Sequence, residues 1–176
     1  MKRTILKFAS MLFVAVAMLN NAYAKASVLT IKQFSERANA NLVKSGADYR
    51  MPSELKIDDG EVNNTAQYMF SDTLGITFVL DKKTNNVKSL MTVVGVSDDG
   101  NQTLRDLMYH AAVIAAFEGK NAMKTVGGRY IKMTAEAVEE FGTTGDTKKS
   151  FILNGKKYGI SMTKGVGIIG YAEPNK

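Results

Sequence analysis

The stretch from residue 66 to residue 96 constrains the fold more than any other part of the sequence. Apolar residues alternate with smaller or polar ones at residues 66–70 and again at residues 74–81. A polar turn at residues 82–86 then leads into residues 87–96, which are rich in β-branched side chains. Short alternating runs separated by turns are typical of strands that bury one face. The stretch therefore predicts a three-stranded antiparallel meander with one face against a core.

The second β region lies at the C-terminus, around the dipeptide Asn154-Gly155. Asn-Gly between two apolar runs is the strongest short signal for a tight hairpin, so residues 149–153 and 156–163 are predicted to pair. This register places Phe151 opposite Tyr158 and Lys149 opposite Ile160. A further two-residue turn at Lys164-Gly165 would pair Ile160 with Ile169 and Tyr158 with Tyr171. The expected core side is then Phe151, Tyr158, Ile160, Ile169 and Tyr171.

The first helix is predicted over residues 31–45. Thr30 followed three residues later by Gln33 is a capping box, and Ile31, Phe34, Ala38 and Leu42 recur at helical spacing. Gly46 follows as a C-terminal stop.

Two further helical regions are less sharply defined. The first spans residues 104–118, with a cap formed by Thr103 and Asp106. Its expected apolar arc consists of Leu104, Leu107, Met108, Ala111, Ile114 and Ala115. Gly127-Gly128 is predicted to break the next helical region, so that a helix at residues 135–141 begins behind a Thr134 cap. Residues 49–51 and 55–57 could form short edge strands.

The order of these elements predicts an α+β fold, an antiparallel sheet made of the N-terminal three-stranded meander and the C-terminal hairpin, with helices packed on it. Residues 25–176 are expected to form a single domain. The chain has no cysteine, so apolar burial has to stabilise it without disulfides.

Residues 1–24 have the three parts of a cleavable signal peptide. Lys2, Arg3 and Lys7 precede an apolar run at residues 8–19, and the segment ends in Ala22-Tyr23-Ala24. Ala22 and Ala24 match the small-x-small pattern that signal peptidase recognises. The apolar run is shorter than the roughly 20 residues of a membrane span, although an uncleaved anchor helix remains an alternative. We expect a mature chain from Lys25, without a stable membrane anchor, in a bacterial periplasm or outside the cell.

The charge and the chemistry-bearing residues exclude several functions. The whole chain has 23 basic and 17 acidic residues; removal of three basic residues with the signal peptide leaves 20 minus 17, or +3. No nucleic-acid footprint is expected at this charge.

One histidine without cysteine is a weak donor set for zinc, so no metal is predicted. Residues 165–170 match G-x-G-x-x-G, but too few residues follow to form the helix that a dinucleotide site requires, and no cofactor is expected.

His110 lies one helical turn from Asp106, which predicts a simple side-chain pair at the surface or its boundary. The alternative is a general-base role, in which a small periplasmic hydrolase uses His110 with a carboxylate. No residue is assigned as catalytic.

Five lysines gather around the C-terminal hairpin, namely Lys148, Lys149, Lys156, Lys157 and Lys164. They could protect a sheet edge from aggregation. The functional interpretation is that Lys149, Lys156, Lys157 and Lys164 make an electrostatic contact with an acidic protein or with an anionic envelope surface. We therefore favour a soluble exported binding protein, such as an inhibitor, immunity or accessory factor acting on another envelope or secreted protein. Dispersed methionines and aromatic residues leave a carrier of an apolar ligand as a further alternative.

Overall fold

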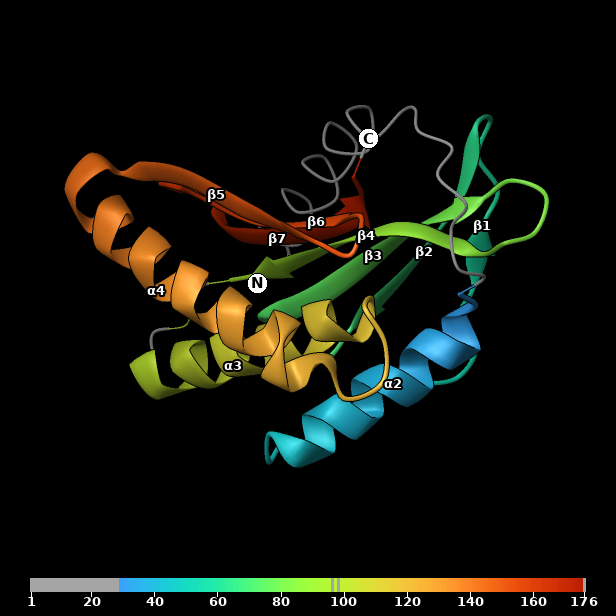
Figure 1. Cartoon of the computed structure of the whole chain (residues 1–176), viewed down its shortest axis with the longest axis horizontal. Helices are drawn as coiled ribbons and strands as arrows, with labels where there is room; N and C mark the ends of the chain where they lie inside the picture. The colour runs from blue at the N-terminus through green and yellow to red at the C-terminus, as the bar shows by residue number, and fades with distance from the viewer. Residues whose placement is uncertain (1–28, 96, 98, 176) are drawn as a thin grey trace.

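The two predicted β segments join into one seven-stranded antiparallel sheet (Figure 1). The computed structural model describes residues 29–95, 97 and 99–175, so the predicted signal peptide and its Ala22 and Ala24 lie outside the described residues. The strands are β1 (Ile57–Asp58), β2 (Asn63–Met69), β3 (Leu74–Asp81), β4 (Val87–Val94), β5 (Asp146–Leu153), β6 (Lys156–Thr163) and β7 (Gly167–Pro174). The helices are α2 (Ile31–Lys44), α3 (Gly100–Ala116) and α4 (Val126–Thr144), with a short 3₁₀ turn η1 (Ala122–Lys124). The predicted α+β class is confirmed.

The sheet is built from two meanders that meet at its centre. Its strand order is β1-β2-β3-β4-β7-β6-β5, with β4 and β7 as antiparallel neighbours. The order is therefore mirrored on either side of this central pair, apart from the two-residue strand β1. Each meander follows helical structure in the chain, α2 before the first and α3 with α4 before the second. The three helices lie on the same side of the sheet (Figure 1).

The first helix forms as the capping box predicts. The Thr30 hydroxyl accepts a hydrogen bond from the Gln33 N–H at 3.2 Å, and the Gln33 side chain accepts one from the Thr30 N–H at 3.1 Å. These bonds satisfy two backbone donors at the helix end. Phe34 is fully buried, and its ring meets that of Phe78 of β3 edge-on, with centroids 5.0 Å apart.

The start and the buried face of α3 differ from the prediction. The N-cap is Asp99, whose carboxylate accepts from the Asn101 N–H at 2.9 Å, and not Thr103. Leu104 and Met108 of the expected apolar arc are 60% and 48% exposed, whereas Asp106 and His110 are fully buried. The predicted arc was therefore right at Ala111, Ile114 and Ala115, which are buried, and wrong in the first half of the helix. Asp106 and His110 turn inward instead, because Thr73 and Thr92 offer them hydrogen-bonding groups.

The predicted break at Gly127-Gly128 is wrong, because α4 runs through both glycines. Glycine disfavours a helix by up to about 1 kcal/mol, and α4 tolerates both glycines. The Met123 side chain lies over the first, where a Cβ would be 2.8 Å from its Sδ atom. Thr134 is an interior residue whose hydroxyl donates to the Tyr130 carbonyl at 2.9 Å, so it caps nothing. Of the two possible edge strands before β2, residues 49–51 form none, and the later one is displaced to β1, which shares only Ile57 with the prediction.

The C-terminal hairpin has the predicted register, with Phe151 opposite Tyr158. The following turn is longer than predicted, because Thr163 pairs with Gly167 and three residues connect them. Ile160 consequently pairs with Gly170, and Tyr158 with Ala172. A one-residue change in register moves every side chain of a strand to the other face. Ile169 and Tyr171 are therefore not on the core side, where Ile168 and Ala172 are buried instead.

Among the described residues, no helix combines the length and the apolar character needed to cross a membrane.

Candidate functional site

Four apolar side chains lie at the centre of the sheet, on the face opposite the helices. They come from the central strands in two directly paired rows, Val93 with Ile169 and Met91 with Tyr171. All four are partly exposed. The face of an antiparallel sheet that is not covered by helices is normally polar, so this group, which we call the apolar quartet, is an exception. In the part of the chain that the structure describes, the three α-helices pack on the other face (Figure 1).

Small residues surround the quartet on the neighbouring strands. Gly159 of β6 is paired with Tyr171, and a Cβ at residue 159 would overlap the tyrosine ring. The ring therefore lies across β6 and covers the glycine backbone. On the other side, a Cβ on Gly75 would be 2.6 Å from the sulfur of Met69, which is 56% exposed. The glycines let the apolar surface extend outward from the two central strands.

Two lysines border the quartet on the β5 side. The Lys157 ammonium lies 5.8 Å from the centroid of the Tyr171 ring, within the range of a cation–π interaction. Lys148 is exposed on the same face of β5, where Ile152 is 55% exposed. This side of the quartet combines positive charge with apolar surface.

The four predicted contact lysines are not brought together. Lys149 points to the helix side and forms an ion pair with Glu140 of α4 at 2.6 Å. Lys156 also points to the helix side, where it pairs with Glu118 at 3.2 Å and donates to the Phe117 carbonyl at 3.1 Å. Lys164 lies exposed in the turn between β6 and β7. Alternation along the strands thus separates Lys157 from Lys149 and Lys156.

The Lys156 contact belongs to a partly buried cluster around Glu118, just after α3. Asn154 donates to Glu118 at 2.6 Å, and the Tyr158 hydroxyl donates to its other oxygen. Burial raises the pKa of Glu118, but these two hydrogen bonds and the Lys156 charge outweigh burial and lower that pKa below its ordinary value. Burial and the neighbouring carboxylate raise the pKa of Tyr158. The cluster ties the end of α3 to the β5–β6 turn.

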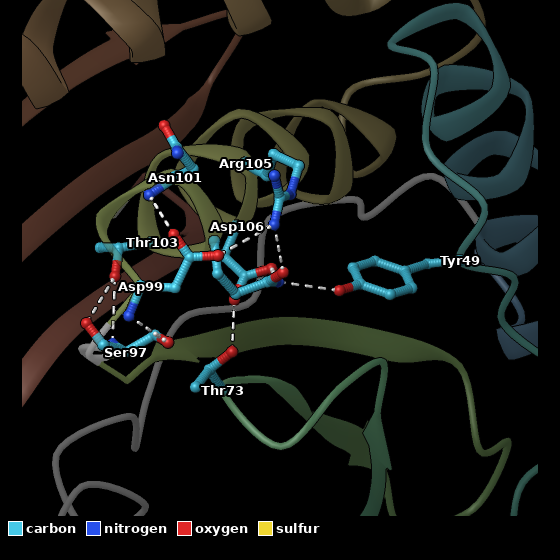
Figure 2. Close-up of polar contacts among 9 residues, drawn as sticks. Tyr49, Thr73, Ser97, Asp99, Asn101, Thr103, Arg105 and Asp106 are labelled. Atoms are coloured by element: carbon cyan, nitrogen blue, oxygen red, sulfur yellow. Dashed lines mark hydrogen bonds and ion pairs between the residues drawn. The ribbon is translucent and has the colours of Figure 1, made fainter.

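The predicted surface pair of Asp106 with His110 is wrong in both location and partners. Figure 2 shows that Asp106 points toward the sheet, where it accepts from the Thr73 hydroxyl. Gln102 donates to its other oxygen at 2.9 Å and also to the Tyr49 hydroxyl at 3.0 Å. Asp106 therefore anchors the first half of α3 to the β2–β3 turn. His110, one turn later, has different partners, Thr92 and Tyr130.

No cluster of three histidine, cysteine or acidic side chains that could hold a metal ion exists among residues 29–95, 97 and 99–175. The G-x-G-x-x-G segment forms the β6–β7 turn and the start of β7. Its last glycine lies against His110 and Tyr130, where a Cβ would overlap both side chains.

The apolar quartet could not be recognised from the sequence. Ile169 and Tyr171 were expected in the core, and nothing in the sequence pairs β4 with β7. The only local signal was the glycine content of residues 165–170. Glycines in a strand indicate that another group approaches the backbone closely, but they do not indicate on which face of the sheet.

The chain matches no protein-family model, and comparison with curated proteins and with solved structures finds no match either.

Proposed function

We propose that this chain is a protein-binding module, an inhibitor, immunity or accessory factor, and that the open face of its sheet contacts the partner. The observation that carries the proposal is the apolar quartet, two cross-strand pairs at the centre of the only face without an α-helix among the described residues. Apolar residues clustered at the centre of a surface, with polar ones around them, are the usual arrangement of a protein interface.

The border residues favour an acidic partner surface. Lys148 and Lys157 lie on the same face as the quartet, and neither forms an ion pair within the described part of the chain. Complementary charges at the rim of an interface mainly speed association and select the partner. The partner would therefore place an apolar side chain on the quartet and carboxylates beside it. Of the four lysines predicted as contacts, we propose that Lys157 and Lys164 face the partner, while Lys149 and Lys156 have intramolecular partners.

The hydrolase alternative gains no support from the position of His110. Its side chain is fully buried, and Asp106 bonds to other groups. A general base has to come within hydrogen-bond reach of a substrate proton. The proposed binding surface lies on the opposite face of the sheet from His110 and does not depend on it.

The experiment compares the exchange of a partly exposed isoleucine for lysine with the same exchange at an exposed one. Ile169→Lys puts a charge into the quartet, whereas Ile131→Lys changes a 44% exposed residue of α4 on the helix side. A photo-crosslinker at residue 93 would first identify the partner in an envelope extract. We expect Ile169→Lys to weaken binding to that partner at least tenfold and Ile131→Lys to leave it unchanged. Equal affinities for the two variants would disprove the proposed surface.

A second measurement tests the charged border. Lys148→Gln with Lys157→Gln should slow association with the partner at low salt and leave the unfolding midpoint nearly unchanged. A wild-type association rate with wild-type salt dependence would remove the lysines from the interface.

We also propose that the protein acts after export, to the periplasm or beyond. This rests on the three-part pattern of residues 1–24. N-terminal sequencing of protein from an exporting bacterial host should begin at Lys25. A product that keeps Met1 in the membrane fraction would contradict export by cleavage.

A further inference from the structure

His110 lies at the point where four elements of the fold meet. Its Nε2 atom contacts the Thr92 hydroxyl of β4 and lies 3.3 Å from the Tyr130 hydroxyl of α4. Beneath it, β7 contributes Gly170, where there is no room for a Cβ. His110 and Tyr130 are both fully buried. The imidazole therefore joins α3 and α4 to the two central strands of the sheet.

The hydrogen bonds around the ring assign its tautomer. The Tyr130 hydroxyl donates to the Gly159 carbonyl at 3.1 Å, and the Thr92 hydroxyl donates to the Gly170 carbonyl at 3.3 Å. With both hydroxyl protons on these carbonyls, the Thr92 oxygen can accept an N–H from Nε2. The opposite tautomer would leave a buried N–H on Nδ1 without an acceptor among the described residues. A neutral imidazole carries one N–H, so the Nδ1 atom holds a lone pair.

The same arrangement has no place for a second proton. Nδ1 is buried and has no hydrogen-bond partner among residues 29–95, 97 and 99–175. The side chains bonded to Nε2 are a threonine and a tyrosine, and the backbone beside it belongs to Gly170. Asp106, the nearest carboxylate along α3, is already held by Thr73 and Gln102. A proton on Nδ1 would bury a positive charge without an acceptor.

We propose that His110 is a pH-sensitive latch, which holds α3 and α4 on the sheet while it is neutral and releases them when it is protonated. The direction of the effect follows from the burial of the ring, which lowers the pKa of His110 from 6.5 to about 3. The unfolded or opened chain then binds the proton more readily than the closed one. The contribution of His110 to stability is complete above pH 6.5 and falls as the pH falls toward 3. The latch lies on the helix side of the sheet and acts whether or not a partner binds the other face.

The single histidine makes the native state directly observable, because one imidazole gives one set of ¹⁵N resonances. We expect the signals of an Nε2–H tautomer that stay constant from pH 8 to pH 5 in the folded protein. Below that range, protonation should coincide with loss of amide protection in α3 and α4, while β3 stays protected longer. An imidazole that titrates near pH 6.5 with unchanged amide protection would overturn the latch, as would an Nδ1–H tautomer.

A variant separates His110 from the carboxylates, which also lower stability in acid. His110→Gln is neutral at every pH and keeps an amide near Thr92. The unfolding equilibrium constant of the wild type should rise, relative to that of His110→Gln, by about tenfold for each pH unit below about 6. Parallel pH dependence of the two proteins would contradict the proposal. If His110→Gln does not fold, the ¹⁵N and hydrogen-exchange titrations of the wild type decide the question alone.

Discussion

Gly170 of β7 lies directly beneath His110 of α3, so close that a Cβ at residue 170 would overlap the Nε2 atom of the imidazole. The Tyr130 hydroxyl would meet the same Cβ. The absence of a side chain at this one position allows two large polar side chains to reach the sheet and bond to it. The glycine is thus as much a part of the central polar cluster as the residues that form its hydrogen bonds.

Gly170→Ala should therefore destabilise the protein by about 2–3 kcal/mol, because overpacking a filled core forces side chains and backbone to move. Denaturant unfolding measures the loss. Gly142→Ala in α4 is the matched control, since a Cβ at residue 142 would have nothing within 4 Å. That change should stabilise by about 0.5–1 kcal/mol through helix propensity. Equal effects of the two substitutions would show that the space over Gly170 is not filled.

Lys156→Gln should lower stability by about 2 kcal/mol, because the Glu118 carboxylate, with its side chain 15% exposed, would lose a charged hydrogen-bond partner. Lys157→Gln on the neighbouring residue and the opposite face should leave the unfolding midpoint nearly unchanged. Urea titrations of the two variants at pH 7 make the comparison. A smaller effect for Lys156 than for Lys157 would show that the Glu118 cluster does not hold α3 to the hairpin.

Asp106→Ala should cost about 2 kcal/mol, since it leaves the Thr73 hydroxyl and the Gln102 amide without their shared acceptor. Asp99→Ala removes a more exposed carboxylate from the same helix, whose loss as an N-cap should cost about 1 kcal/mol. Thermal or denaturant unfolding of both variants ranks the two carboxylates. The reverse order would mean that the cap, and not the contact with the β2–β3 turn, holds the first half of α3.

Thr30→Ala should destabilise by about 1 kcal/mol, because the Gln33 N–H loses its side-chain acceptor at the start of α2. Thr30→Ser keeps the hydroxyl and should retain most of the stability. Denaturant unfolding measures the stability of both variants, from the shift of the midpoint at an unchanged dependence of the unfolding free energy on denaturant concentration. A Thr30→Ser variant as unstable as Thr30→Ala would mean that the methyl group, and not the hydrogen bond, matters here.

The sequence alone determined the features that depend on neighbours a few residues apart. Thr30 with Gln33 fixed the start of α2, and Asn154-Gly155 fixed the pairing of Phe151 with Tyr158, because capping and tight turns are closed within four residues. Alternation at residues 74–81 likewise identified the strand, and Phe78 of this strand meets Phe34. The prediction of one buried face was wrong for this strand, because every residue from Leu74 to Leu80 is buried.

Only the tertiary structure decided what depends on contacts between distant segments. The three-residue turn after Thr163 shifted β7 by one residue, which placed Tyr171 on the open face and Gly170 under His110. The burial of Asp106 and His110 on an alanine-rich helix likewise depended on the hydroxyls of Thr73, in the β2–β3 turn, and of Thr92, in β4. A polar side chain is buried only where it finds a hydrogen-bond partner. The partners of these two side chains lie outside α3, so the sequence of the helix does not reveal them. The apolar quartet has the same origin, since it exists only because β4 pairs with β7.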